Sequence, residues 1–197
     1  SHCFTTRFGG VSEGSQSSLN LAVGRGDTME NVEKNLRILG KALDFDPEKL
    51  VMTMQIHSDI VVKVGRQDRG NLMVEGASPE CDALITNDPG VALVVFTADC
   101  TPILLHDPVT GAVGAAHAGW RGTAKGIGAR VVEAMVKNFG SRPEDIRAAI
   151  GPNIGVCCFE THEDVPNAVR AVLGPEAEDY IVPAGEKFRV DLKGVNA

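Results

Sequence analysis

Residues 102–119 read "PILLHDPVTGAVGAAHAG" and contain the clearest structural pattern in the chain. Two apolar runs flank an Asp-Pro…Gly turn, and this pattern predicts two antiparallel strands joined as a hairpin. If "DPVT" (107–110) forms a four-residue loop, Cys100 lies directly across from His117. Residues opposite each other in such a pair have Cβ atoms roughly 4.5–5.5 Å apart on one face of the sheet. The hairpin therefore predicts that Cys100 and His117 are neighbours.

The segments around the hairpin alternate between strand-like and helix-like patterns. Apolar residues at helical spacing predict helices over 26–43, 123–140 and 162–173, the last two ending at glycines. Short apolar runs predict a buried strand over 91–100 and a further strand over 146–150. Asp27 and Glu30 fit a capping box at the start of the first helix. This alternation predicts a mixed α/β fold, with residues 1–197 forming one domain.

The composition narrows the class of protein. A hydrophobic content of 43% and a charged content of 23% are typical of a soluble globular chain. The net charge of −7 argues against nucleic acid as a partner, because phosphate-backbone binding needs clustered Lys and Arg. No apolar run approaches the roughly 20 residues of a membrane helix, and the first residues do not resemble a signal peptide. We expect no nucleic-acid or membrane partner.

The cysteines indicate the redox environment. The chain has 5 cysteines, an odd number, without C-x-x-C spacing, which favours reduced thiols in a cytoplasmic protein. A bridge between the adjacent Cys157 and Cys158 would be strained, so both are interpreted as free thiols.

Cys100 and His117 are candidate ligands of one metal ion. Their expected separation suits zinc, with Zn–S at about 2.3 Å and Zn–N at about 2.0–2.1 Å. His57, in "MQIHSD" after a strand-like run, is the best third ligand, with His2, His106 and His162 as competitors. One Cys and two His would leave a fourth position open, as in catalytic zinc sites. From spacing alone, the alternative that Cys100 and His117 are ordinary core residues stays open and is favoured.

Other motifs are less specific. "GVSEG" (10–14) matches a nucleophile elbow, but a polar loop follows it instead of a helix, so Ser12 is interpreted as a turn residue. Arg121 in "GWRGTA", and Arg7 and Asn20 in glycine-rich loops, are candidates for binding an anion or simply solvated side chains. Asp99 could orient a metal ligand or act as an acid or base, or only bond to a strand end.

Seven blocks in order carry a resemblance to a known family: "FTTRFGGVS", "SLNLAVGRGD", "MQIHSD", "CDALIT", "TADCTPILL", "AAHAGWRGT" and "IGPNIGVCCFE". They resemble the YfiH family, also called the laccase-domain or multicopper polyphenol oxidase family and now largely viewed as purine nucleoside phosphorylases. The resemblance implies a layered α/β/β/α architecture with mixed sheets and a natural protein that continues beyond Ala197. It also implies a metal site of His57, Cys100 and His117, usually with zinc and in some claims with copper.

The resemblance also maps substrate residues. The family's Asn of the "LNLG" block corresponds to Asn20, but its Arg of the "ENR" block corresponds to Leu36. Arg37 is one step along the predicted helix and so points about 100° away. We expect Arg7 or Arg121 to supply the missing positive charge.

The resulting hypothesis is a cytoplasmic, metal-dependent purine nucleoside phosphorylase. It would cleave adenosine, inosine or methylthioadenosine with phosphate, and also deaminate adenosine, as a monomer or weak homodimer. His57, Cys100, His117 and Asp99 would form the catalytic site, and Asn20, Arg7 and Arg121 would bind substrate or phosphate. The alternatives are a copper polyphenol oxidase, a Cys–His hydrolase or cell-wall precursor editing enzyme, and a domain whose metal is only structural.

Overall fold

The largest element of the fold is a five-stranded sheet. A computed structural model describes residues 2–71 and 76–197, and the sheet has the order β2-β3-β6-β5-β7. Its strands are β2 (Val61–Lys63), β3 (Ala83–Thr86), β5 (Thr101–His106), β6 (Val113–Ala118) and β7 (Arg147–Ile150). Only the β2–β3 pair is parallel among these, and β3–β6, β6–β5 and β5–β7 are antiparallel. The mixed α/β class is therefore confirmed.

The predicted hairpin forms, but its register differs from the prediction. His106 pairs with Val113, and Pro102, not Cys100, lies opposite His117. The loop lies one residue later than predicted, at residues 108–111, because Asp107 pairs with Ala112 at the end of the ladder. The Asp107 carboxylate holds this turn by accepting hydrogen bonds from the Val109 and Thr110 amides. The Asp107 amide donates to the Ala112 carbonyl.

This change of register moves the opposing strand by two residues. Side chains alternate between the faces of a strand with period two, so Cys100 and His117 stay on the same face as diagonal neighbours.

Helices α2 (Trp120–Ala124) and α3 (Ile127–Phe139) replace the single helix predicted over 123–140. Gly126 separates them with φ of 70°, a left-handed conformation that interrupts the helical hydrogen bonds. Helix α3 buries Ile127, Val131 and Met135 against the sheet, whereas Val136 is 39% exposed. The helix ends at Gly140 as predicted.

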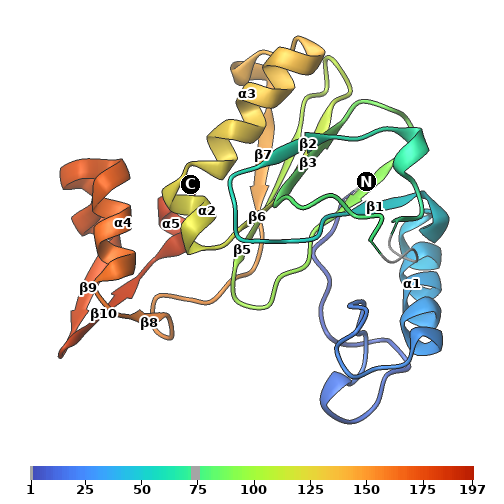
Figure 1. The fold of residues 1–197 in the computed structure, drawn as a ribbon, viewed down its shortest axis with the longest axis horizontal. Helices are drawn as coiled ribbons and strands as arrows, with labels where there is room; N and C mark the ends of the chain where they lie inside the picture. Colours follow the sequence, from blue (N-terminus) through green and yellow to red (C-terminus); the bar gives the residue numbers. More distant parts are fainter. Residues whose placement is uncertain (1, 72–75) are drawn as a thin grey trace.

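Helix α1 (Met29–Leu43) packs beside a separate two-stranded parallel sheet of β1 (Leu50–Met52) and β4 (Ala92–Val94) (Figure 1). The predicted capping box is wrong: Thr28 is the N-cap, and its hydroxyl accepts from the Asn31 amide. The strand predicted over 91–100 shortens to β4, because the residues after it run as a loop toward Cys100.

The C-terminal part packs around its own small core. It contains the antiparallel sheet of β8 (Glu160–Thr161), β10 (Lys187–Val190) and β9 (Ile181–Ala184), with α4 (Asp164–Leu173) and α5 (Leu192–Val195). Trp120 of α2 packs against this core and so joins it to the central sheet. Figure 1 shows this part as a lobe at one side of the molecule.

Short 3-10 helices complete the fold at Gly14–Gln16, Pro47–Lys49, Arg66–Asp68, Pro143–Asp145 and Gly174–Tyr180. Among the residues that the structure describes, no helix has the length and apolar character needed to cross a membrane.

Candidate metal centre

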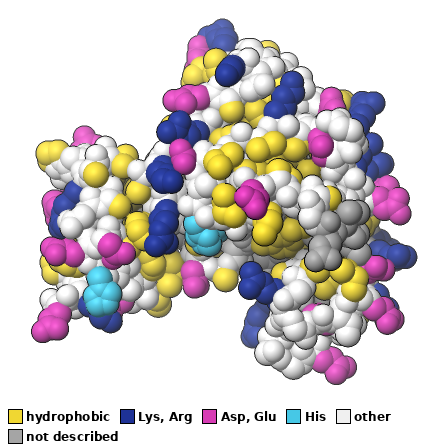
Figure 2. All heavy atoms as spheres, viewed as in Figure 1, with side chains coloured by type: hydrophobic (Ala, Val, Ile, Leu, Met, Phe, Trp, Pro, Cys, Tyr) yellow, Lys and Arg dark blue, Asp and Glu magenta, His cyan; other side chains and the backbone are white. Residues whose placement is uncertain are grey.

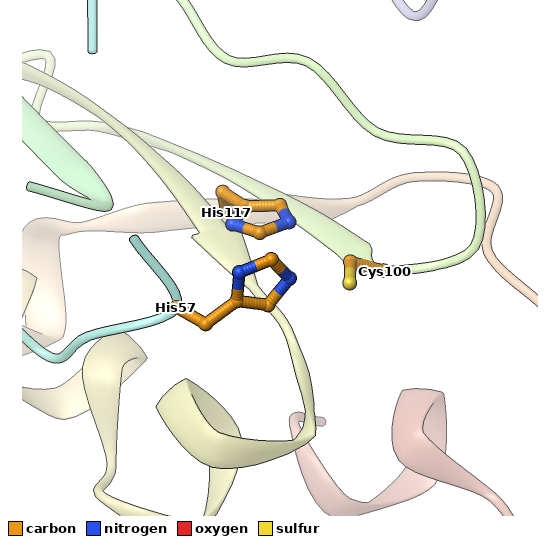
Figure 3. A group of neighbouring side chains, drawn as sticks. All are labelled: His57, Cys100 and His117. Atoms are coloured by element: carbon orange, nitrogen blue, oxygen red, sulfur yellow. The ribbon is translucent and has the colours of Figure 1, made fainter. Parts of the chain in front are cut away.

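Three side chains from separate segments meet at one end of the central sheet. His57 lies on the loop between β1 and β2, Cys100 directly precedes β5, and His117 lies on β6. Their ligand atoms all lie within 4.8 Å of one another. The two imidazole rings have centroids 4.9 Å apart at an interplanar angle of 81°, and the Cys100 sulfur lies beside them (Figure 3).

His117 is fixed by a buried carboxylate. Its Nδ1 lies 2.8 Å from Oδ1 of Asp82, and its backbone amide donates to the Asp82 carbonyl at 2.7 Å. Burial lowers the pKa of His117, although the Asp82 carboxylate opposes this effect. A neutral imidazole that donates from Nδ1 to Asp82 leaves the Nε2 lone pair available to a metal ion.

The same carboxylate holds the loop that carries His57. Asp82 accepts hydrogen bonds from the Ser58 amide at 2.6 Å, the Ser58 hydroxyl at 2.7 Å and the His57 amide at 3.1 Å. Burial alone would raise the pKa of Asp82, but the hydrogen bonds from Ser58 and His117 lower it overall. These bonds maintain His57 at a φ of 58°, a left-handed conformation that is costly for a residue with a side chain.

Cys100 is half-buried, and the space beside it depends on Gly119. A Cβ atom at Gly119 would lie 2.8 Å from Cδ2 of His57 and 3.2 Å from the Cys100 sulfur. The small residue therefore lets the chain pass directly beside two candidate ligands. Burial raises the pKa of the Cys100 thiol, and the charges of Asp99 and Asp82 raise it further.

These three groups fit a metal ion. One thiolate and two imidazoles are ligands that zinc prefers, and a sulfur and a nitrogen bound to one zinc ion lie at most about 4.4 Å apart. The 4.8 Å limit on the observed separations is within a few tenths of an ångström of that value. A bound cation would also reverse the effect that keeps Cys100 protonated, because a coordinating thiol is deprotonated. Within residues 2–71 and 76–197 this is the one such group of His, Cys, Asp or Glu side chains.

The other predicted site residues each contact different neighbours. Asp99 is exposed next to Cys100, and its carbonyl accepts from the Ile154 amide. The Asn20 side chain donates to the Ala22 carbonyl and the Asp27 carboxylate. The exposed guanidinium groups of Arg7 and Arg121 lie over the rings of Phe8 and Trp120, at 4.7 and 4.2 Å from the ring centroids.

Ser12 and Leu36 both lie in the interior of the fold. Ser12 is 4% exposed, donates to Asp27 and accepts from Asn35, so it is a buried hydrogen-bonding residue and not the predicted turn residue. Leu36 is buried in a core cluster with Val32 and Leu50, and the exposed Arg37 lies 3.9 Å from Glu33.

Asp82 belongs to the candidate site but is not among the residues predicted from the sequence. It occurs in "CDALIT", one of the blocks that carry the family resemblance, directly before a fully buried strand. A carboxylate in such an apolar setting needs hydrogen-bond donors. An Asp directly before an apolar strand therefore indicates a buried carboxylate with several partners. Nothing in the local sequence indicates that those donors come from residues 56–58 and from His117.

The arrangement is a His–Cys–His group that could hold a metal ion on a mixed α/β fold, and the chain is similar to known proteins. The family model described as "Multi-copper polyphenol oxidoreductase laccase" matches residues 1–197. A protein of Deinococcus radiodurans named purine nucleoside phosphorylase is 42% identical over 99% of this chain and 72% of its own length. The Escherichia coli purine nucleoside phosphorylase YfiH is 37% identical over 96% of this chain and 73% of its own length.

Solved structures show the same fold. The Bacillus licheniformis hypothetical protein YfiH superposes with a TM-score of 0.93 at 37% identity, covering 98% of this chain and 73% of that one. YlmD from Geobacillus stearothermophilus superposes with a TM-score of 0.92 at 39% identity, covering 98% and 72%. The chain belongs to this laccase-domain family, the YfiH family.

Proposed function

We propose that the protein is a metal-dependent purine nucleoside phosphorylase that acts on adenosine, inosine or methylthioadenosine and also deaminates adenosine. The observation that carries the proposal is the convergence of His57, Cys100 and His117, in a chain whose relatives are named purine nucleoside phosphorylases. Zinc suits this donor set best, and copper is the second choice. When bound, the metal would supply Lewis acidity and lower the pKa of a bound water toward about 7.

The chain's own residues position the site. Asp82 keeps His117 in the tautomer whose Nε2 is free, and it holds the His57 loop through the Ser58 and His57 amides. Gly119 leaves room beside the sulfur of Cys100. Because these groups are held before substrate arrives, little reorganisation is needed during the reaction.

Phosphorolysis needs a positive charge for the attacking phosphate. A phosphate oxygen would form a bond to the anomeric carbon of the ribose while the glycosidic bond breaks and the purine leaves and takes up a proton. Arg121, two residues after Gly119, or Arg7 would hold the phosphate, and Asn20 and Asp99 would contact substrate or order the site. Figure 2 shows Lys and Arg side chains beside a histidine at the centre of one face, which supports anion binding there.

The decisive experiment incubates the zinc-loaded protein with inosine, with and without phosphate. Hypoxanthine should appear together with ribose 1-phosphate only when phosphate is present. Equal release of hypoxanthine without phosphate would indicate a hydrolase and would refute the phosphorylase assignment. Adenosine, followed separately for inosine and ammonia, tests the deaminase activity.

The variant His57→Ala tests the metal site in the same assay. His57 is exposed, so the variant should fold, bind zinc more weakly and lose activity by roughly a hundredfold or more. Full activity of the chelated protein, combined with its loss on thiol alkylation, would instead favour a Cys100–His117 hydrolase.

The description of the family favours one second candidate, a copper polyphenol oxidase. Such an enzyme needs several copper ions, and the described residues bring together one group of three ligands. Copper stoichiometry and oxidation of a phenol therefore separate the two functions. More than one tightly bound copper per chain, with phenol oxidation and no phosphorolysis, would support the oxidase.

A further inference from the structure

Cys157 and Cys158 form a pair of thiols at the surface, away from the three candidate metal ligands in sequence. Both residues are exposed, and their sulfur atoms lie 3.0 Å apart. They occupy a turn on the segment between β7 and β8. The turn is closed by hydrogen bonds from the Cys158 and Phe159 amides to the Gly155 carbonyl.

The other cysteines in the described residues have different surroundings. Cys81 is fully buried, and Cys100 is half-buried beside His57. Cys3 is exposed, but among the described residues no second sulfur contacts it. Only Cys157 and Cys158 combine solvent access with a neighbouring thiol, which is the combination that permits an internal disulfide to form.

We propose that Cys157 and Cys158 are a redox site, which hydrogen peroxide oxidises reversibly to a disulfide between adjacent residues and which reacts before Cys100. The thiolate of one residue attacks a peroxide oxygen, the O–O bond breaks, and a sulfenic acid forms as hydroxide leaves and takes up a proton to become water. The neighbouring thiol attacks the sulfenic sulfur, the S–S bond forms, and a second water leaves. The two sulfurs lose two electrons in total and the peroxide gains them.

The contact between the two sulfurs suits this sequence of steps. The hydrogen bond to Cys157 raises the pKa of Cys158, and the charge of Cys157 raises it further. The first step needs one thiolate, and the second needs another sulfur within reach of the sulfenic acid. The 3.0 Å separation of the two sulfurs meets the second requirement.

The resulting disulfide should be easy to reduce. The Cα atoms of adjacent residues joined by a trans peptide are about 3.8 Å apart, below the usual 4.4–6.8 Å of disulfides. A strained and exposed disulfide has a more oxidising potential than a structural one and is labile. This property makes the pair suited to a reversible change and unsuited to stabilising the fold.

The test treats the zinc-loaded protein with a small excess of hydrogen peroxide, alkylates the remaining thiols, and maps the peptides by mass spectrometry. The peptide with Cys157 and Cys158 should lose two hydrogens and escape alkylation, whereas Cys100 should still be a reduced thiol that is alkylated. Brief treatment with dithiothreitol should restore both thiols. In Cys157→Ser and Cys158→Ser, the remaining thiol should instead give a sulfenic acid that dimedone traps.

Three results would overturn the proposal: both thiols stay alkylatable while Cys3 or Cys100 reacts, either sulfur is bridged to another cysteine, or the pair proceeds to sulfinic acid. Cys3→Ser is the matched control, because it removes an exposed thiol without a neighbouring sulfur. It should leave the oxidation of the pair unchanged. The two single variants at 157 and 158 should retain the zinc affinity of the unmodified protein, which shows that the pair is separate from the metal site.

Discussion

At the scale of single residues, Asp82 connects the two candidate histidine ligands. The carboxylate bonds to the side chain of His117 and to the backbone amide of His57, and it is fully buried. Carboxylates in this position orient a metal-binding imidazole and raise its basicity. A loss of Asp82 would therefore affect both histidines at once.

We expect Asp82→Asn to lower zinc affinity roughly 10–100-fold, because such second partners of metal ligands typically have effects of this size. A competition titration with a coloured chelator measures this change, and circular dichroism checks the fold. Ser58→Ala removes one donor to Asp82 but keeps the carboxylate on His117, so it should have a smaller effect.

Asp99→Asn is the matched comparison, because Asp99 lies beside Cys100 but, among the described residues, makes no hydrogen bond to either histidine. It should change zinc affinity less than Asp82→Asn does. An equal or larger loss in Asp99→Asn would show that the orienting carboxylate is Asp99.

Gly119 gives a second test at this scale. In Gly119→Ala the new Cβ would lie 2.8 Å from His57 and 3.2 Å from the Cys100 sulfur, so at least one ligand must move. We expect zinc affinity to fall by roughly tenfold or more. Gly128→Ala is the control, because its Cβ would meet only Ile103 at an ordinary 3.6 Å. Equal zinc affinities of the two variants would contradict the role of Gly119.

At the scale of elements, the β5–β6 hairpin shows how far sequence reasoning reaches. The two apolar runs and the turn residues predict the hairpin, and the alternation of side chains places Cys100 and His117 on one face. The exact register depends on the Asp107 side chain, whose hydrogen bonds to the turn amides compete with ladder bonds. Local patterns also do not reveal the break at Gly126, since a helical run permits glycine at moderate cost.

The Asp107 turn predicts a dependence of stability on pH. Hydrogen bonds from Ser141 and Thr110 lower the pKa of Asp107 from 3.8 to about 2. A carboxyl with a lowered pKa in the folded state stabilises the protein above its unfolded pKa, and that contribution is lost as the pH falls toward the folded value. Stability should therefore decrease between about pH 4 and pH 2.

Urea unfolding across this pH range measures the effect. Asp107→Asn should be less stable at neutral pH and show a shallower decline below pH 4. Ser141→Ala keeps the carboxylate but removes the side chain with the largest lowering effect on its pKa, so its curve should lie between the two. Parallel curves for the unmodified protein and Asp107→Asn would contradict the assignment.

At the scale of the whole molecule, the candidate metal centre joins three parts of the chain that are distant in sequence. His57, Cys100 and His117 come from two loops and a strand, and tertiary packing alone brings His57 to the other two. The hairpin accounts for Cys100 and His117 from local sequence, whereas the sequence around His57 leaves other histidines as competitors and only the family resemblance selects His57. The orienting role of Asp82 required the structure, because its partners are 24 and 35 residues away.

Zinc should stabilise the whole fold because an unfolded chain does not present these ligands together. At a free zinc concentration one hundred times the dissociation constant, the free energy of unfolding should rise by about 2.7 kcal/mol. Urea unfolding with zinc and with chelator measures the difference. His57→Ala should lose this dependence on zinc, and a dependence of the same size in that variant would show that zinc binds elsewhere.

The amide side chain of Gln55 connects the two loops that carry His57 and Cys100. Its Nε2 donates to the Phe96 carbonyl at 2.8 Å, and its Oε1 accepts from the Phe96 amide at 2.7 Å. The side chain thus imitates one more rung of the β1–β4 ladder, beyond the Met52–Val94 pair. Gln55 precedes His57 by two residues, and Phe96 precedes Cys100 by four. The two hydrogen bonds between Gln55 and Phe96 therefore connect the loop that carries His57 to the loop that carries Cys100. We therefore expect the two loops to be displaced together, so that the imidazole of His57 and the sulfur of Cys100 keep their separation.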